Sequence, residues 1–475
     1  MLSYDGPNFK STNYTVIQLD EEAVLSDEEK GEFIKSFASS FITELLGMWE
    51  FTVELAKQNL DSEQVKHLME YPKDFFQLII FDMNVPFHLL PLIDHFGKIP
   101  AIGTSPFASA PFIAEAFGHH FCTYFPNYRL PYTDEMSFFQ RVQNTVVYAF
   151  SIGIKKYYIR KLDALLKEKI DKDVRSIKDY ENDIGLLLSN YDPILDFPEP
   201  IPPHIIPVGG LHATPSKKLP EDLQQILDNS KHGVIFFSLG TNIQLSWWSL
   251  ETRKKFVDAF AKLKETVLWK YGGDDLTELP KNVIIRKWYP QNDILDYKRV
   301  CVVQDYNIGH KNVKLFITHN GALSTHEAMY HGVPVIGIPF FMDQINNARK
   351  VESKGIGKKV DFPTLTAEGL HKTIQEILQN ATYKENAQKL SEQYKDRPET
   401  SLERAIFWIE YTLRHKDIRN LSTKGRYMSF YERENLDVVV FLLLAISSVI
   451  YLLFFVSKWL AEETIFRKKD KIKVH

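Results

Sequence analysis

One stretch of the sequence constrains the fold more than any other, residues 314–344, which read KLFITHNGALSTHEAMYHGVPVIGIPFFMDQ. Leu315–Thr318 is a short apolar run typical of a buried strand, and a turn and a helical pattern follow it. A second apolar run, Val335–Ile338, predicts another buried strand. Buried strands that alternate with helices form parallel sheets, so this part of the chain is expected to be α/β.

Polar side chains in this stretch stand where ligands bind to such sheets. The helix N-terminus exposes unpaired backbone N–H groups and a partial positive charge, which favour a phosphate. The imidazole of His319 and the hydroxyl of Ser324 add hydrogen-bond donors there. Asp343 and Gln344 follow the second strand, and a carboxylate beside an amide suits paired sugar hydroxyls. Each piece alone is also typical of an ordinary strand–turn–helix unit that binds no nucleotide.

The length and composition exclude several classes of protein. With 475 residues, of which 44% are hydrophobic, the chain is long enough for two domains with their own cores. The formal net charge of −4 argues against a general nucleic-acid binder, because no basic excess is available to neutralise phosphates. Cys122 and Cys301 are the 2 cysteines, which excludes a disulfide-rich scaffold and a cysteine zinc cluster.

A proline-rich segment, residues 197–220, divides the sequence. Repeated prolines disfavour regular structure and stiffen a connection, so this segment is the predicted linker. Residues 1–196 form the predicted N-terminal domain, in which Phe75–Phe81 reads as a buried strand. Residues 221–436 form the predicted C-terminal domain, whose first strand is Val234–Leu239. Strands alternate with helices on both sides of the linker, so two doubly wound α/β domains are expected.

Three further features of the sequence each have two interpretations. Asp82 follows the first strand, where its carboxylate either faces a ligand crevice or caps the next helix. Gly240 allows close approach of a ligand and Thr241 can donate to a phosphate, although an ordinary tight turn needs neither property. Met136–Ile159 is rich in aromatic and β-branched residues and contains no acidic residue, so it either packs in the core or lies against a membrane surface.

The C-terminal part of the sequence predicts a membrane anchor. Val438–Ser457 contains no charged residue and has about the 20 residues that a spanning helix needs, whereas a buried core helix would be expected to have a polar face. Residues 458–475 form a basic tail, which the positive-inside rule places in the cytosol, with the body on the far side of the membrane. Lys471 and Lys473 in this tail resemble a dilysine signal for retrieval to the endoplasmic reticulum.

The N-terminal residues conflict with that topology. Met1–Asp20 lacks the order of basic, apolar and small residues that defines a signal peptide. Two interpretations are open: the sequence begins after the signal peptide, or the tail anchors a cytosolic body. Asn13, Asn380 and Asn420 begin N-x-S/T sequons, which accept glycans only if the body is lumenal.

Taken together with Trp288, Pro290 and Gln291 in KWYPQND, residues 314–344 resemble the donor-binding signature of the UDP-glycosyltransferases of animals, most nearly those of insects. The resemblance extends from about Phe75 to the C-terminus. It implies the GT-B fold, in which two Rossmann-like doubly wound domains face each other across a cleft. The N-terminal domain would bind the acceptor and the C-terminal domain the UDP-sugar. No cofactor or metal is implied, because the UDP-sugar is a co-substrate and donors at the helix end stabilise the departing UDP.

The resemblance also assigns roles to individual donor-binding residues. The implied contacts are uracil stacking by Trp288, ribose binding by Gln291 and Glu327, diphosphate binding by Thr241, His319, Gly321 and Ser324, and sugar-hydroxyl binding by Asp343 and Gln344.

The catalytic pair of the family is only half present in this sequence. In the family a histidine oriented by an aspartate deprotonates the acceptor hydroxyl, and Asp82 matches the aspartate. The histidine has no counterpart, and His88 is expected to be a packing residue instead. Loss of an N-terminal segment would explain the missing histidine and the missing signal peptide together. Two other departures are an insertion, Asp296–Gly309, and Asn320, which replaces a small residue at the turn.

The predicted function is transfer of a sugar, with glucose expected, from a UDP-sugar to hydroxyl groups of small lipophilic acceptors by inverting displacement. Such a glycoprotein hexosyltransferase would act in detoxification at the endoplasmic reticulum membrane. The alternative is a non-catalytic member, without the base histidine, that binds UDP-sugar weakly and pairs with active homologues or with itself. A dinucleotide oxidoreductase is disfavoured because no GxGxxG turn occurs. No motif specifies the acceptor.

Overall fold

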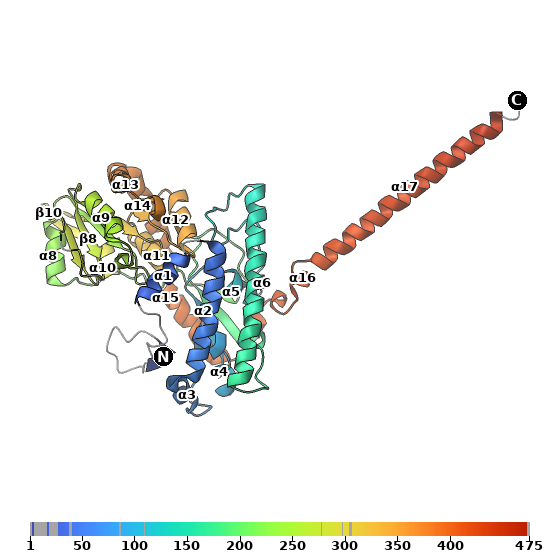
Figure 1. Cartoon of the computed structure of the whole chain (residues 1–475), viewed down its shortest axis with the longest axis horizontal. Helices are drawn as coiled ribbons and strands as arrows, with labels where there is room; N and C mark the ends of the chain where they lie inside the picture. The colour runs from blue at the N-terminus through green and yellow to red at the C-terminus, as the bar shows by residue number, and fades with distance from the viewer. Residues whose placement is uncertain are drawn as a thin grey trace.

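The computed structural model describes residues 2–3, 17–18, 27–37, 40–84, 87–108, 110–276, 278–296, 298–303 and 306–472. Two parallel sheets with helices packed around them form the body, and one long helix leaves it (Figure 1). The helices are α1 (Asp27–Phe37), α2 (Phe41–Asp61), α3 (Glu63–Met69), α4 (Leu92–His95), α5 (Pro111–Ala116), α6 (Phe138–Lys169), α7 (Ile177–Asp183), α8 (Glu221–Asn229), α9 (Leu250–Phe260), α10 (Gln291–Leu295), α11 (Ala322–His331), α12 (Gln344–Ser353), α13 (Ala367–Gln379), α14 (Ala381–Lys395), α15 (Ser401–His415), α16 (Phe430–Arg433) and α17 (Leu436–Ile472).

The first sheet has the order β3-β4-β5-β6, and all its strands are parallel. Its strands are β3 (Ile79–Asp82), β4 (Ala101–Ser105), β5 (Ile184–Ser189) and β6 (Ile205–Pro207). Every residue of β5 is buried, as expected for an inner strand that helices cover on both faces. A separate short pair, β1 (Leu2–Ser3) and β2 (Ile17–Gln18), is also parallel.

The second sheet has the order β14-β13-β12-β7-β8-β9 and is parallel throughout. Its strands are β7 (Val234–Ser238), β8 (Thr266–Lys270), β9 (Val283–Arg286), β12 (Val313–Thr318), β13 (Val335–Gly337) and β14 (Gly357–Lys359). From β7 the chain first adds β8 and β9 on one side. It then returns to the other side of β7 and adds β12, β13 and β14, which makes the sheet doubly wound. The predicted α/β class is confirmed.

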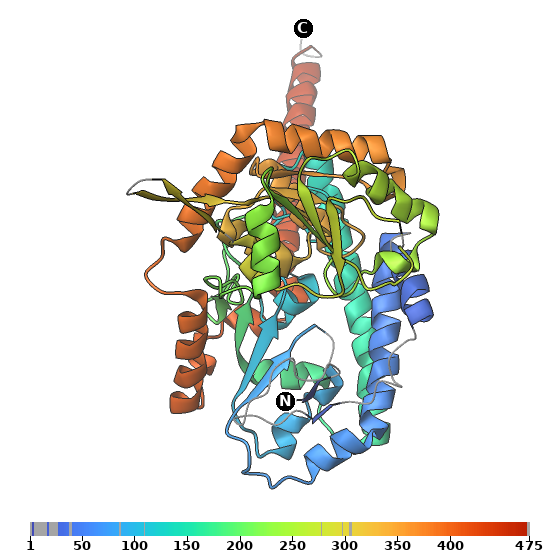
Figure 2. The same ribbon diagram turned by 90° about the vertical axis from the view of Figure 1, so that its left-hand side faces the viewer.

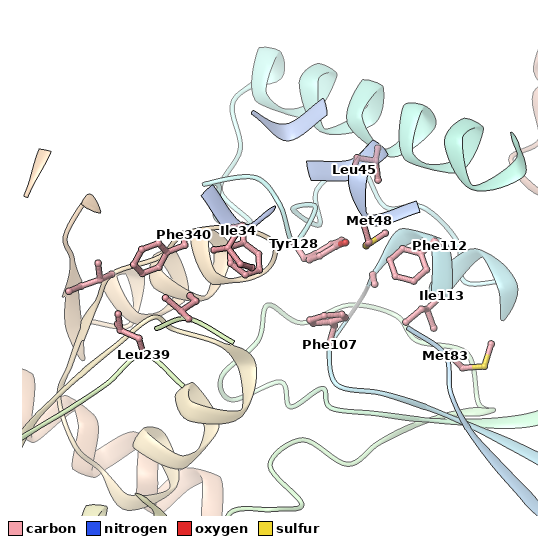
Figure 3. Packing of buried hydrophobic residues seen from close by; sticks show 14 of the residues in the cluster. Ile34, Leu45, Met48, Met83, Phe107, Phe112, Ile113, Tyr128, Leu239 and Phe340 are labelled. Carbon is pink, nitrogen blue, oxygen red and sulfur yellow. The ribbon is translucent and has the colours of Figure 1, made fainter. Parts of the chain in front are cut away.

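One hydrophobic cluster extends through both halves of the body (Figure 3). Phe107 and Phe112 enter it from the segments that follow β4, while Leu239 and Phe340 enter it from the second sheet. Tyr128 lies between the two groups and is 6% exposed. Because the two sheets share a packed cluster, their relative position is fixed by buried apolar area.

Helix α6 contains most of Met136–Ile159, the segment expected either to pack in the core or to lie against a membrane surface. A capping box formed by Ser137 and Gln140 begins the helix, and one face packs on α2, where Tyr158 stacks on Trp49 with ring centroids 6.0 Å apart. The opposite face is open, since Phe139 is 80% exposed. The segment therefore packs in the core with one side and presents apolar side chains to its surroundings with the other.

Two segments depart from the predicted division into domains. Strand β6 lies inside the predicted linker, residues 197–220, and pairs with β5. Its last residue, Pro207, stands in an outer strand of the sheet, where a missing N–H is tolerated. Helix α15 belongs by sequence to the predicted C-terminal domain but packs on the first sheet, where its Ala405 and, after the helix, Ile418 are part of the buried cluster around Ile102. The chain thus crosses between the two sheets twice.

The predicted insertion forms a hairpin of its own. Strands β10 (Lys298–Val303) and β11 (Tyr306–Lys311) pair antiparallel and, among the described strands, form a two-stranded sheet of their own. The hairpin projects from the edge of the body, at the left of Figure 2. Strand β12 begins directly after it and pairs with β7; the register is irregular between Val313 and Leu315 and continuous from Leu315 to Thr318.

The long helix α17 extends away from the body (Figure 1). Within it, Leu436–Ile465 is apolar enough to cross a membrane, with a mean hydropathy of 2.9, and 0% of its most apolar window is buried. The segment before it is fixed to the first sheet by Arg426, whose guanidinium donates to the carbonyls of Ile184 (2.8 Å) and Ala116 (3.2 Å). The base of α17 is therefore tied to the first half of the body.

Candidate functional site

The carboxyl ends of β7 and β12 are neighbours in the second sheet. Strands β8 and β9 lie on one side of this pair and β13 and β14 on the other, so the strand order reverses here. Open α/β sheets bind ligands in the crevice outside the strand ends at such a reversal. Gly240 and Thr241 follow β7, and His319 follows β12. The topology thus brings three predicted donor residues to one crevice.

The imidazole of His319 is held between two glycine turns. Gly240 has a φ of +78°, and a Cβ there would lie 2.7 Å from His319 Cε1. A Cβ on Gly321 would also collide with the ring. Burial, followed by the positive charge of Lys270, lowers the pKa of His319 to about 4. The ring is therefore neutral near neutral pH and can donate one hydrogen bond.

A cavity of about 290 Å³ opens beside this turn. Gly240, Thr241, Lys270 and Trp288 are among its lining residues. The indole of Trp288 is 67% exposed, so one of its faces is available to stack on a planar base.

Lys270 is a cavity residue that the sequence reasoning missed. Its ammonium group donates to the carbonyl of Gly240 at 3.0 Å, and burial lowers its pKa. Lys270 belongs to no motif; it is the last residue of β8, and only the pairing of β8 with β7 brings it to the crevice. Its position at a strand end was the sequence signal that could have revealed it.

Three polar side chains contact one another where α10 meets α11. Gln291 Nε2 donates to Ser324 Oγ at 3.0 Å and also to Glu327 Oε2. Burial raises the pKa of Glu327 to about 6 against the opposing effect of the Gln291 hydrogen bond. A carboxylate and an amide side by side can accept from and donate to vicinal hydroxyls.

Asp343 and Gln344 begin α12 next to the N-terminus of α11. The backbone N–H of Ala322, in the first turn of α11, hydrogen-bonds the Asp343 carboxylate. Asn347 Nδ2 donates to Asp343 Oδ2 at 2.6 Å. Burial raises the pKa of Asp343 to about 6 despite the charge of Lys350 and these hydrogen bonds. Gln344 is buried and accepts hydrogen bonds from the preceding backbone.

The predicted donor residues thus gather around the N-terminus of α11. Asp82 stands apart at the end of β3 in the other sheet. Among the described residues, no group of three or more His, Cys, Asp and Glu side chains is arranged to hold a metal ion. The expectation that no metal takes part stays a prediction.

A family described as "UDP-glucoronosyl and UDP-glucosyl transferase" matches residues 92–471. The chain belongs to this family. It is 34% identical over 460 residues to "UDP-glycosyltransferase UGT5" of Dactylopius coccus, in an alignment that covers 94% of this chain and 83% of the relative. It is 30% identical over 453 residues to "UDP-glucuronosyltransferase 1A9" of Mus musculus, with coverages of 94% and 81%. The predicted family is confirmed, and with it an enzyme class that transfers sugars from UDP-sugars to acceptors.

A solved structure shares the fold of this UDP-glycosyltransferase. "Spinosyn Forosaminyltransferase SpnP" matches with a TM-score of 0.51 at 15% identity, covering 78% of this chain and 84% of that chain. At this level of identity the likeness concerns the fold alone. The predicted GT-B architecture is confirmed.

In this UDP-glycosyltransferase the Asp82 carboxylate accepts a hydrogen bond from the backbone N–H of Asn84 at 2.9 Å. Desolvation by the surrounding protein raises its pKa. His88 is 1% exposed and its Nε2 lies 2.9 Å from Asn59 Nδ2, while burial lowers its pKa to about 3. His88 is therefore a packed, neutral side chain, as predicted.

Asn320 occupies the turn with a φ of +59°, in the left-handed region that asparagine tolerates better than most residues. Its side chain is 0% exposed, and neither of its two polar atoms has a hydrogen-bond partner among the described residues. The side chain lies against Gly337 of β13, where a Cβ would collide with it. This departure from the family pattern is accommodated by the backbone, but it leaves two buried polar atoms unpaired.

Proposed function

We propose that this UDP-glycosyltransferase transfers glucose from UDP-glucose to hydroxyl groups of small lipophilic acceptors. The observation that supports the proposal is the gathering of an exposed indole, a Gln–Glu pair, a neutral imidazole and a buried Asp–Gln pair around one helix N-terminus. Each of these groups suits one part of UDP-glucose: the uracil, the ribose, the diphosphate and the sugar hydroxyls.

The same groups account for stabilisation of the departing UDP. The acceptor oxygen attacks the anomeric carbon, the bond from that carbon to the diphosphate oxygen breaks, and the acceptor proton passes to a base. Negative charge then grows on the diphosphate, where the N–H groups of α11, the neutral His319 and the cation of Lys270 are already in place. Preorganised donors of this kind lower the barrier without reorganising during the reaction.

One observation favours the second candidate function, a non-catalytic donor-binding partner of active homologues. The hydrogen bond recorded for the Asp82 carboxylate comes from the backbone of Asn84, and no imidazole contacts it within the described ranges. Within the described residues no histidine is placed for Asp82 to orient, so these residues alone supply no base of the family type. Such a chain would bind UDP-glucose without turning it over.

Membranes from cells that express the 475-residue chain distinguish the two functions. They would be given labelled UDP-glucose and a phenol, with the Trp288→Ala variant as control. A phenyl glucoside that forms only with the unsubstituted chain supports the enzyme. Retention of UDP-glucose without product supports the non-catalytic partner. Failure to retain UDP-glucose contradicts both functions.

We also propose that α17 crosses the endoplasmic reticulum membrane, with the body lumenal and the basic tail cytosolic. The apolar, unburied span and the basic residues that follow it support this topology. Asn380 and Asn420 are both exposed and therefore accessible to the glycosylation machinery. Loss of mass on glycosidase treatment, absent from the Asn13→Gln/Asn380→Gln/Asn420→Gln triple variant, is the expected result. A chain that glycosidase leaves unchanged would contradict a lumenal body.

A further inference from the structure

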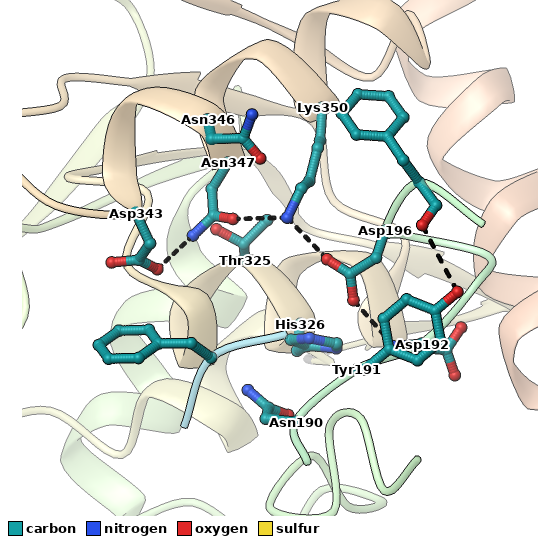
Figure 4. Close-up of polar contacts among 12 residues, drawn as sticks. Asn190, Tyr191, Asp192, Asp196, Thr325, His326, Asp343, Asn346, Asn347 and Lys350 are labelled. Carbon is teal, nitrogen blue, oxygen red and sulfur yellow. Dashed lines mark hydrogen bonds and ion pairs between the residues drawn. The ribbon is translucent and has the colours of Figure 1, made fainter. Parts of the chain in front are cut away.

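A continuous line of polar contacts leads from the predicted sugar site to the other sheet (Figure 4). Asn347 Nδ2 donates to Asp343 Oδ2 at 2.6 Å, and Asn347 Oδ1 accepts from Lys350 Nζ at 3.1 Å. Lys350 Nζ also lies 2.7 Å from Asp196 Oδ1. Asp343, Asn347 and Lys350 follow one face of α12 at helical spacing, whereas Asp196 comes from the segment after β5.

This line of contacts is buried along its whole length. The side chains of Lys350 and Asp196 are 6% and 4% exposed. A buried charge that loses its partner is strongly unfavourable, so the two ions hold each other in place. Asn347 is fixed by one more contact, because its Nδ2 also donates to the carbonyl of Asn320 at 3.0 Å. Each group therefore has one available orientation.

Asp196 is in turn held within the first half of the body. Its Oδ2 accepts from the backbone N–H of Asp192 at 2.8 Å. The Asp192 carboxylate pairs with Arg397 at 2.9 Å, after α14, which is a second contact across the two halves. The loop that carries Asp196 is thus held by hydrogen bonds and by the Asp192–Arg397 ion pair, which fixes the position of the Lys350–Asp196 pair.

We propose that Lys350 is a positioning residue for the donor sugar. Through Asn347 it holds the Asp343 carboxylate in the orientation that accepts hydrogen bonds from sugar hydroxyls, and Asp196 holds Lys350. Recognition of the sugar then depends on the packing of the two halves, although the uracil, ribose and diphosphate residues all lie in one of them. The inference rests on the proposed role of Asp343 in UDP-glucose binding.

The charged and titratable groups around Asp343 come from several elements. Tyr128, Asp196, His326 and Lys350 line the same small cavity as Asp343. Glu44 of α2, paired with Arg129 at 2.8 Å, accepts from the backbone N–H of Met342 beside it. Burial lowers the pKa of His326 to about 4 and raises the pKa of Tyr128, so both are neutral near neutral pH. Among the charged groups here, the charge of Lys350 lowers the pKa of Asp343, so removal of that charge should raise this pKa.

Titration of the full-length chain with UDP and with UDP-glucose separates positioning of the sugar from general folding. In Lys350→Met we expect affinity for UDP-glucose to fall by about tenfold, while affinity for UDP, which lacks the sugar, stays unchanged. Asp196→Asn should have the same selective effect, and Lys350→Arg should restore much of the affinity. Arg349→Met, next in sequence but ion-paired with Glu352 and 42% exposed, is the matched control.

The pH dependence of UDP-glucose affinity gives a readout that a merely structural role would not move. Glu327, whose pKa is also about 6, would contact the ribose of both ligands, so the readout is the affinity for UDP-glucose relative to that for UDP. In the unsubstituted chain this ratio should fall as pH drops through about 6, where Asp343 gains a proton. Loss of a nearby positive charge disfavours the carboxylate, so in Lys350→Met this fall should move upward by about one pH unit.

Equal weakening of UDP and UDP-glucose in Lys350→Met, or an unchanged affinity for both, would overturn the inference while leaving the proposed function intact. An unmoved pH profile in a variant that binds UDP normally would overturn it as well. An unsubstituted chain that binds UDP but gains nothing from the glucose would overturn the proposed function, and the inference with it.

Discussion

Lys270 illustrates how the crevice obtains its charge. Its ammonium group contacts a carbonyl, and no acidic side chain pairs with it in the part of the chain that the structure describes. The neighbouring His319 is neutral, whereas Lys270 brings a positive charge to the turn by its contact with the Gly240 carbonyl. A half-buried cation without an acidic partner is costly unless an anion occupies the crevice, which is the condition that a diphosphate would meet.

Lys270→Met should therefore weaken binding of UDP by at least about tenfold, because a charge-assisted hydrogen bond is lost. Binding of uridine, which has no phosphate, should not change. The matched control is Lys287→Met, since Lys287 lines the same cavity but is 69% exposed and paired with Asp274 at 3.1 Å. Inhibition constants for UDP and uridine measure the difference, and an equal effect on both ligands would contradict this role.

Asn320 has a positive φ and two buried polar side-chain atoms without a hydrogen-bond partner among the described residues, and both features are unfavourable for folding. Asn320→Gly should raise the free energy of unfolding by about 1 kcal/mol, because glycine takes a positive φ freely and two unpaired buried polar atoms are removed. Asn435→Gly is the control, with the same backbone conformation at an exposed position. A melting temperature that falls in Asn320→Gly would show that its side chain has a structural function.

At the scale of elements, the apolar runs and glycines of the sequence correctly predicted the strands and turns that depend on neighbouring residues alone. The apolar runs at β7, β12 and β13 are strands because buried parallel strands are apolar throughout, and the glycines after β7 and β12 mark real turns. Strand β6 was not predicted, because it lies in a proline-rich segment that reads as a linker. Nothing in the sequence of α15 indicates that this helix packs on the first sheet. The pairing of β8 with β7, which brings Lys270 to the crevice, is likewise a long-range property.

The β10–β11 hairpin can be removed without loss of the predicted site. Lys298 and Lys311 face each other across the hairpin, so a two-residue Asn-Gly turn in place of residues 299–310 joins the remaining ends. We expect UDP affinity to be unchanged and the free energy of unfolding to move by less than about 0.5 kcal/mol, because the hairpin projects away from the sheet. Calorimetry and thermal unfolding measure both quantities. A tenfold loss of UDP affinity would show that the hairpin supports the crevice.

At the scale of the whole molecule, contacts at the base of α17 join it to the body. Arg426 and the contact of His120 with Glu434 (3.0 Å) fix this base to the first half, and among the described residues 0% of the most apolar window beyond it is buried. The predicted donor residues lie on the second half, so α17 and the proposed site are on different halves of the body. The sequence predicted a helix that is apolar enough to cross a membrane, because about twenty uncharged residues need no tertiary context to be recognised.

A chain ending after Glu434 should therefore leave the membrane and keep its fold. We expect it in the supernatant after an alkaline wash, with the UDP affinity of the full-length chain, because 0% of the most apolar window of the span is buried. Sedimentation followed by calorimetry measures both properties. A truncated chain that stays with the membranes would reveal a second attachment, for which the exposed apolar face of α6 would be the first place to look.

The crevice between β7 and β12 is proposed to bind a UDP-sugar. Calorimetric titration of the full-length chain with UDP-glucose measures this binding most directly. We predict saturable binding at one site, weakened by about tenfold in Trp288→Ala through loss of stacking on the base. Because the indole is 67% exposed, this variant should unfold at the same temperature as the unsubstituted chain. Equal affinities in the two chains, or no saturable binding in either, would contradict the account.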